Sequence, residues 1–175
     1  MKDELKRTHA SSNPLIKIFF RTKTNLAIKI ACLKKSDIIL DYGCGGGFLK
    51  NKLKSMGFNA LGYDITPEHS DLEDYRELNP NKIFAIDVFE HIDKKEVIKI
   101  IRDFKVMNPN FNLIVIIPTE NFISRKIRRL LGKSERVSDH ITPLNEILKI
   151  LNSELKLIKK VNFLSISYIA KFRNQ

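Results

Sequence analysis

The hydrophobic pattern of the first third of the chain predicts a helix followed by a strand–helix–strand unit. Apolar residues recur at helical spacing over 13–35, and Pro14 suits the first turn of that helix. The short apolar run 37–42 is typical of a buried parallel strand, and apolar residues three or four positions apart over 48–57 predict a second helix. A second strand at 59–65 completes the unit, whose crossover is expected to be right-handed.

The alternation of strands and helices continues to the end of the chain. The expected elements are a helix in the polar stretch 69–78, a strand at 82–89, a helix from Asp93, a strand at 112–118, a helix from Thr142, and strands at 155–163 and 165–172. The last two strands are too close together for a crossover helix, so they should pair antiparallel. The pattern therefore predicts an α/β fold: a doubly wound, mostly parallel sheet with helices on both faces and an antiparallel strand near the edge.

Glycines are concentrated directly after the first predicted strand, in "IILDYGCGGGFL". Without side chains, Gly43, Gly45 and Gly47 let the backbone approach a ligand closely. Open α/β sheets bind ligands beyond the carboxyl ends of their strands, where Asp41 and Asp64 end the first two strands. An acid at the second position can accept hydrogen bonds from both ribose hydroxyls. The loop and the two acids together predict a nucleoside cofactor.

Two common nucleotide motifs do not fit this glycine pattern. The dinucleotide fingerprint counted from Gly43 needs a small residue where Phe48 stands, which disfavours NAD. No Lys-Ser or Lys-Thr pair follows the glycines, which excludes a phosphate-binding P-loop.

The spacing Asp-x-Gly-x-Gly-x-Gly from Asp41 to Gly47, followed by "GYDI", "IDVFEHI", "IPT" and "DHITPLNEIL", resembles the class I S-adenosylmethionine-dependent methyltransferases. The resemblance covers nearly the whole chain. It implies a Rossmann-like sheet of the seven-stranded type, S-adenosylmethionine as the cofactor and methyl transfer as the reaction. The cofactor-binding residues that it implies are Asp41, Tyr42, Gly43, Cys44, Gly45, Gly47, Asp64, Ile65, Asp87 and Val88.

One part of the chain departs from the family pattern. Between the second and third predicted strands there are too few residues for the family's usual helix, strand and adenine-contacting loop. The domain is therefore expected to lack either the third strand of the family's sheet or the helix that precedes it. No residue is assigned to adenine other than Ile65, which follows the ribose acid directly and is a candidate to pack against the ring.

Three residues at the carboxyl edge are candidates for the catalytic base. Methyl transfer mainly requires that the acceptor be held in line with the sulfonium, but a hydroxyl or amine acceptor also benefits from a base. Glu90, His91 and His140 are the candidates. The structural alternative is that Glu90 and His91 only open the following helix and that His140 caps or packs before Thr142.

The same residues also resemble a metal site. Asp87-x-x-Glu90-His91 is similar to the divalent-metal motif of quinone-biosynthesis O-methyltransferases. With His140 added, it resembles the metal site of small-RNA 3′-end 2′-O-methyltransferases. Oxygen and nitrogen ligands of this kind can hold Mg²⁺ or Mn²⁺. Asp87 stands where the motif has Glu, which shortens its reach by one methylene.

Positive charge is concentrated in two segments of this chain of net charge +11. Residues 1–35, expected to form a basic N-terminal helix and cap, hold nine Lys/Arg and two acids, and the basic segment 119–136 holds six and two. The second segment lies within a predicted substrate-side insertion at 119–141. Its Arg125, Lys126, Arg128 and Arg129 would favour an acceptor with phosphate or carboxylate groups if some of them face the substrate. The alternative is a helix whose charges face water.

The sequence as a whole predicts a single methyltransferase domain over 1–175 that acts on a small anionic acceptor: a metabolite, quinone precursor, lipid headgroup or glycan. One alternative is an RNA 2′-O-methyltransferase, with or without metal assistance. Another is a methyltransferase-like module that binds without catalysis. The basic balance favours RNA, but no aromatic-basic interleaving supports it. The absence of a signal peptide and of a membrane-spanning apolar run predicts a cytoplasmic protein, and leaves contact with a membrane surface and the oligomeric state open.

Overall fold

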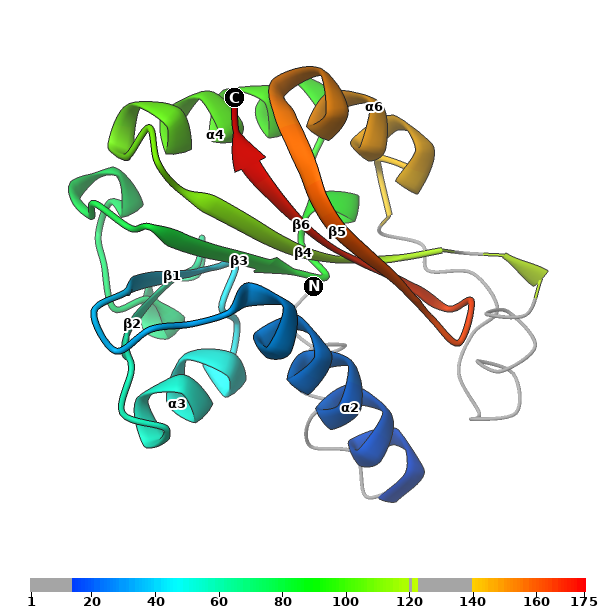
Figure 1. Ribbon diagram of the computed structural model, residues 1–175, viewed down its shortest axis with the longest axis horizontal. Helices are drawn as coiled ribbons and strands as arrows, with labels where there is room; N and C mark the ends of the chain where they lie inside the picture. Colours follow the sequence, from blue (N-terminus) through cyan, green and yellow to red (C-terminus); the bar gives the residue numbers. More distant parts are fainter. Residues whose placement is uncertain (1–13, 120, 123–139) are drawn as a thin grey trace.

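The computed structural model describes residues 14–119, 121–122 and 140–175 (Figure 1). The helices are α2 (Pro14–Ala31), α3 (Phe48–Ser55), α4 (Lys94–Met107) and α6 (Leu144–Glu154). The strands are β1 (Ile38–Tyr42), β2 (Asn59–Tyr63), β3 (Lys82–Ile86), β4 (Asn112–Pro118), β5 (Leu155–Phe163) and β6 (Ser167–Asn174). Short 3₁₀ turns are η1 (Pro67–His69), η2 (Tyr75–Glu77) and η3 (Phe89–His91). Within the described residues, no helix has the length and apolar character needed to cross a membrane.

The strands form one six-stranded sheet in the order β2-β1-β3-β4-β6-β5. β1 pairs parallel with β2 and β3, and β3 pairs parallel with β4. β6 lies between β4 and β5 and is antiparallel to both. This topology confirms the predicted α/β sheet, mostly parallel with an antiparallel strand near its edge. Each parallel strand ends at the same edge, which brings the loops after β1, β2, β3 and β4 together.

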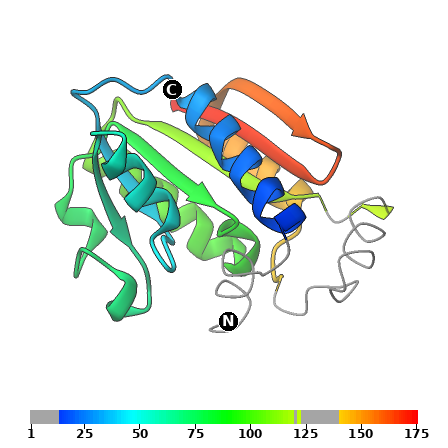
Figure 2. The ribbon, with the colours of Figure 1, turned by 90° about the horizontal axis from the view of Figure 1, so that it is seen from below.

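Helices cover both faces of the sheet (Figures 1 and 2). On one face α4 and α6 bury a core that contains Phe104, Phe111 and Phe172. On the other face α2 and α3 pack against Ile39 and Ile114 of the sheet. In Figure 2, α2 runs across the β5–β6 end of this second face. Two helical layers on a central sheet are the doubly wound arrangement that the alternating pattern predicted.

Local signals in the sequence fix where several elements begin. Asp93 caps α4, because its carboxylate accepts hydrogen bonds from the backbone N–H groups of Lys95 (2.9 Å) and Glu96 (3.2 Å). Pro14 is the first residue of α2, where a missing N–H costs nothing. Between β2 and β3 the chain forms only η1 and η2, so the expected loss of one strand is confirmed.

The helix predicted in 69–78 is wrong, since the segment forms no α-helix. Short polar side chains here bind nearby backbone instead: the Ser70 hydroxyl accepts from the Leu72 N–H (3.3 Å), and the Asp74 carboxylate accepts from the Arg76 N–H (2.9 Å). Such bonds compete with the helical hydrogen-bond pattern. The result is an irregular loop that folds back on β2.

Candidate active site

The glycine loop turns sharply at the carboxyl end of β1. Gly43, Gly45 and Gly47 have φ of 72°, 48° and 77°, a region that side chains rarely adopt. A Cβ built on Gly43 would lie 2.5 Å from a γ-carbon of Val88, which follows β3. Only glycine lets the loop pass this close to the next strand's end. The loop therefore lies against a second predicted cofactor segment, 87–88.

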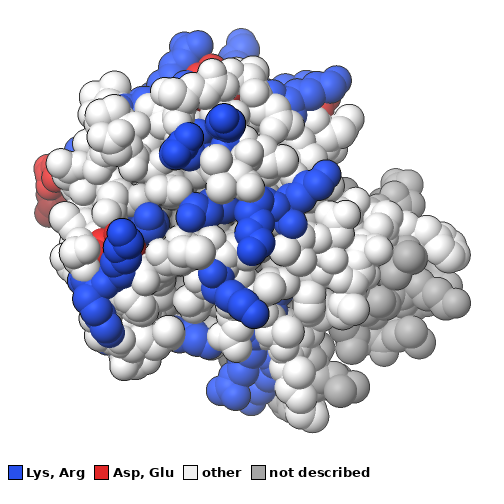
Figure 3. Space-filling model, in the orientation of Figure 1, with Lys and Arg blue, Asp and Glu red and all other residues white. Residues whose placement is uncertain are grey.

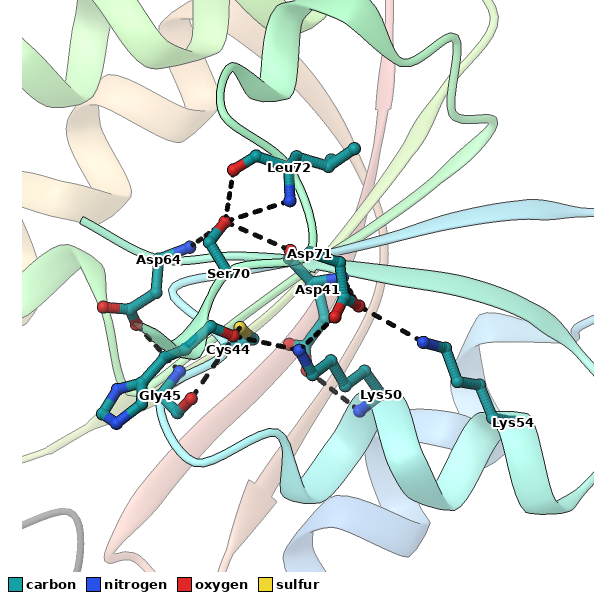
Figure 4. A network of polar contacts seen from close by, with 11 residues as sticks. Asp41, Cys44, Gly45, Lys50, Lys54, Asp64, Ser70, Asp71 and Leu72 are labelled. Atoms are coloured by element: carbon teal, nitrogen blue, oxygen red, sulfur yellow. Dashed lines mark hydrogen bonds and ion pairs between the residues drawn. The ribbon is translucent and has the colours of Figure 1, made fainter. Parts of the chain in front are cut away.

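Asp64 ties the end of β2 to the same loop. One carboxylate oxygen accepts the Gly45 N–H (2.8 Å), and the other accepts the Thr66 N–H (2.9 Å). Figure 4 shows Asp64 facing Gly45. The carboxylate is half-buried, and each of its oxygens has a second lone pair. Asp64 thus keeps acceptor capacity beside the loop, as a ribose-binding acid requires.

Asp41 lies below the loop and is almost fully buried. Its carboxylate accepts the Lys50 N–H at the start of α3 (3.0 Å). Burial raises the pKa of Asp41 to about 7, although the hydrogen bond from Lys50 and the Lys50 charge act in the opposite direction. Asp41 therefore connects the end of β1 to the start of α3 from beneath the glycine loop.

Lys50 and Asp71, which the sequence analysis did not single out, connect the start of α3 to β2 beside the glycine loop (Figure 4). The Lys50 ammonium donates to the His69 carbonyl (3.0 Å) and to the Asp71 carboxylate (2.7 Å), which also accepts the Gly62 N–H (3.0 Å). Burial alone would raise the pKa of Asp71, but hydrogen bonds from Lys50, Gly62 and Lys54 lower it. Lys50 and Asp71 are 21 residues apart, so no local pattern reveals the pair.

The remaining predicted cofactor residues of β1 and β2 differ in exposure. The Tyr42 ring is buried against Tyr63 and Tyr75, with ring centres 5.5 and 5.0 Å away. The Cys44 side chain is buried too, and burial raises the pKa of its thiol to about 12. Ile65 is 78% exposed beside Asp64. Tyr42 and Cys44 thus pack inside the protein, whereas Ile65 is open to a ligand.

Asp87 forms an ion pair with Lys23 of α2. Asp87 has a φ of 53°, which is uncommon for a residue with a side chain, and its N–H donates to the Ile116 carbonyl (2.9 Å). Lys23 is almost fully buried, and its ammonium lies 4.4 Å from the centre of the Phe20 ring. The pair holds α2 against the loop after β3, a contact that sequence reasoning missed because 64 residues separate its partners.

Glu90, His91 and His140 come together at the carboxyl edge of β3. A ligand atom of each lies within 4.8 Å of the others, and the two imidazole rings are 4.9 Å apart. The Glu90 carbonyl accepts the Ile141 N–H (2.7 Å), and the Thr142 hydroxyl donates to the Ile92 carbonyl (2.6 Å). These bonds bring His140 to η3. Asp87, the fourth member of the resembled metal motif, is not in this group and pairs with Lys23 instead.

The comparison with family models decides the family. The model of the methyltransferase domain matches residues 17–156, which span most of the chain and every site described above. The chain belongs to the class I S-adenosylmethionine-dependent methyltransferases. No curated protein is significantly similar to it in sequence.

Solved structures share the fold of this methyltransferase at low sequence identity. The PH0226 protein from Pyrococcus horikoshii OT3 has a TM-score of 0.71 and 16% identity, over 99% of this chain and 97% of that one. Magnesium protoporphyrin IX methyltransferase (ChlM) from Synechocystis PCC 6803, solved with bound SAH, has a TM-score of 0.67 and 15% identity, over 99% and 94%. The small RNA methyltransferase HEN1 has a TM-score of 0.66 and 16% identity, over 90% of this chain but 26% of that one. These neighbours include enzymes of both small molecules and RNA.

Not every predicted site segment of the methyltransferase can be placed. Arg125, Lys126, Arg128 and Arg129 lie outside the described residues, as do most of the predicted insertion 119–141 and the first 13 residues. The residues that the structure does bring together are the glycine loop, Asp64, the Asp87–Val88 segment and the cluster of Glu90, His91 and His140. All except His140 follow β1, β2 or β3, and His140 lies after β4, in the segment before α6.

Proposed function

We propose that this methyltransferase transfers the methyl group of S-adenosylmethionine, bound at the glycine loop, to a small anionic acceptor. One observation carries the assignment of the cofactor site: the Asp64 carboxylate is hydrogen-bonded to Gly45 and half-buried at the end of β2. A ribose acid and a backbone cradle are thereby joined in one unit.

The residues around the loop fit the cofactor chemically. Asp64 would accept hydrogen bonds from the ribose hydroxyls, the glycine loop would lie along the amino-acid part, and Asp87 and Val88 would lie nearest the sulfonium. S-adenosylmethionine supplies a methyl group that is already activated for in-line displacement. The chain then has to orient the acceptor and receive its proton, for which Glu90, His91 and His140 are the candidate bases.

The charge of the chain supports an anionic acceptor. The net charge is +11, and α2, which reaches Asp87 through Lys23, also carries the exposed Lys17 and Arg21. Positive potential near a site raises the local concentration of anionic substrates. Metabolites, quinone precursors, lipid headgroups and glycans with phosphate or carboxylate groups all meet this requirement. Incubation of a cell extract with isotopically labelled methyl donor, followed by mass spectrometry, would identify the labelled product.

Calorimetry with S-adenosylmethionine tests the cofactor site. We expect binding to the unaltered chain and at least a tenfold weaker affinity in Asp64→Ala, because two charge-assisted hydrogen bonds are each worth about 1.5–3 kcal/mol. Glu68→Ala, an exposed acid in the following turn, is the matched control and should bind as the unaltered chain does. If the unaltered chain gave no heat of binding, the non-catalytic module would be the better interpretation.

A second candidate function, metal-assisted methylation of RNA, is favoured by the cluster of Glu90, His91 and His140. A structural neighbour is a small RNA methyltransferase. If this function is correct, millimolar Mg²⁺ or Mn²⁺ should raise the melting temperature, EDTA should reverse the rise, and His140→Ala should abolish it. His69→Ala, a half-buried histidine outside the cluster, is the control. A melting curve that does not move with either metal would remove the metal-assisted candidate.

A further inference from the structure

Three exposed apolar side chains belong to segments that meet at the β5–β6 hairpin. They are Ile18 of α2, Phe122 after β4 and Leu164 in the turn between β5 and β6, exposed by 60%, 78% and 63%. We call these three residues the apolar tip. Monomeric proteins seldom leave several large apolar side chains together in water without a binding role.

Contacts of neighbouring residues show that the segments carrying the apolar tip meet at this hairpin. The Thr119 hydroxyl and the Asn121 amide both donate to the Ser165 carbonyl, at 2.7 and 2.5 Å. On the other side, the Phe19 ring of α2 lies 5.3 Å from the Phe163 ring at the end of β5. The hairpin thus connects the segment after β4 to the beginning of α2.

The elements that carry this tip are uniformly basic. α2, β5 and β6 together contain nine Lys/Arg and not one Asp or Glu. The exposed members are Lys17, Arg21, Lys29, Lys156, Lys159, Lys160 and Arg173. Figure 3 shows Lys and Arg spread over the face seen in Figure 1, with few acidic residues among them. In the hairpin, Lys156, Lys159, Lys171 and Arg173 share the side of the sheet that α2 covers, whereas Lys160 pairs with Ala170 on the opposite side. We call the surface formed by α2 and these four residues the basic face.

The register of the β5–β6 hairpin places like charges opposite each other. Lys156 faces Arg173, and Lys159 faces Lys171. Like charges directly opposite in a sheet are destabilising, and no acid on either strand compensates them. An anionic surface against the basic face would relieve this repulsion.

We infer that the apolar tip and the basic face dock on a bilayer that contains anionic lipids. The tip enters the interfacial region while the lysines meet the headgroups, the combination that binds peripheral proteins to membranes. The tip lies beside Pro118, at the carboxyl end of β4, so docking brings the active-site edge close to the lipid. This inference rests on the proposed function, and it adds that the methyl acceptor is a lipid or a molecule carried in the membrane.

The chemistry of the tip favours a bilayer over a nucleic acid. Single-stranded nucleic acids are held by aromatic rings on which bases stack. Two of the three tip residues are aliphatic, and Phe122 is the one aromatic member. Aliphatic side chains gain free energy by leaving water for the acyl region, by up to about 1.5–3 kcal/mol each.

Co-sedimentation of the full chain with vesicles tests this inference. Vesicles of phosphatidylcholine alone are compared with vesicles that contain about one third phosphatidylglycerol, at low and high salt. We expect binding to the anionic vesicles that weakens at high salt. The double variant Phe122→Ser/Leu164→Asn should partition at least tenfold less, and asparagine tolerates the φ of 51° at position 164.

Two further variants complete the design. The matched control, Met56→Ser/Val106→Ser, removes two exposed apolar side chains from the ends of α3 and α4 and should bind within twofold of the unaltered chain. Lys156→Glu/Lys159→Glu should reduce anionic-vesicle binding about tenfold or more, since each lysine contributes about 1 kcal/mol near such a surface.

The inference would be overturned if the chain did not bind anionic vesicles or bound neutral vesicles equally well. It would also be overturned if the tip variant bound vesicles as tightly as the unaltered chain does. Salt-dependent binding of an RNA oligonucleotide, kept by the tip variant, would overturn it as well. Calorimetry with S-adenosylmethionine on the same preparations separates this failure from a failure of the proposed function. Cofactor binding without vesicle binding would reject the membrane alone, and vesicle binding without cofactor binding would reject the cofactor site.

Discussion

Two carboxylates at the same edge of the sheet have different surroundings. Asp64 is half-buried, accepts two backbone N–H groups and has oxygen lone pairs left for a ligand. Asp41 is buried beneath the loop, and burial raises its pKa to about 7. An ionised carboxylate is costly in such a place unless several donors meet it. We therefore interpret Asp41 as a support of the loop and Asp64 as the residue that meets the cofactor.

Asp41→Asn is expected to change how stability depends on pH. Between pH 4 and 7 the folded protein holds a proton on Asp41 that the unfolded chain has released, so the stability that Asp41 contributes falls as the pH rises. Asparagine keeps the shape without the charge. The variant should match the unaltered chain near pH 4 and exceed it above pH 7, by on the order of 4 kcal/mol at most.

Urea denaturation at pH values from 5 to 8 measures this difference, with Glu73→Gln, an exposed acid, as the control. A difference between Asp41→Asn and the unaltered chain that stays constant with pH would contradict the interpretation.

At the scale of the elements, the segment between β2 and β3 forms a loop where the family pattern has a strand. Side-chain hydrogen bonds hold this loop against β2. The Asp71 N–H donates to the Gly62 carbonyl (2.8 Å), and its carboxylate accepts the Gly62 N–H. The same carboxylate receives the Lys50 ammonium from α3. This loop therefore fixes β2, and with it Asp64, relative to the helix that follows the glycine loop.

Asp71→Ala should lower the free energy of unfolding by about 1–2 kcal/mol, because it leaves Gly62 and the Lys50 ammonium without this partner. Asp71→Asn keeps one acceptor oxygen and should lose less. The loss should shrink as the pH falls below 4, since a lowered pKa means that the carboxylate stabilises the fold above that pH. Urea denaturation measures both variants, with Glu77→Ala as the exposed control. Equal stability of Asp71→Ala and Glu77→Ala would argue against this role.

Sequence reasoning succeeded where the signal was local. Asp93 precedes a helical pattern and caps α4, and the short connection after Phe163 predicted the antiparallel hairpin. It failed where side chains act across long separations or compete with the backbone. The Lys23–Asp87 pair leaves no spacing to read, and Ser70 and Asp74 bind backbone groups in a stretch whose composition is compatible with a helix.

Considered as a whole, the molecule has one sheet with a core on each face, and the two cores share every central strand. Ile83 and Phe84 of β3, for example, belong to opposite cores. Neither core can lose its packing without exposing the other side of the same strands. We therefore expect the single domain predicted over 1–175 to unfold as one cooperative unit.

Denaturation followed by two probes tests this expectation. The chain has no Trp and four Tyr, and Tyr42, Tyr63 and Tyr75 cluster in the core under α4. Tyrosine fluorescence therefore reports on that core, and far-ultraviolet circular dichroism reports on all helices, including α2. The two midpoints should coincide. Separate midpoints would show that the α2 side unfolds independently.

The hydrogen bonds between Asp71 and Gly62 also bear on self-association. An open sheet has two borders where another chain could add a strand and begin a fibril. At the β2 border, the donor and the acceptor of Gly62 are already taken by Asp71. At the β5 border, Lys156, Lys159 and Lys160 would repel the same strand of an approaching copy. The chain should therefore resist amyloid-type stacking at both borders even when concentrated.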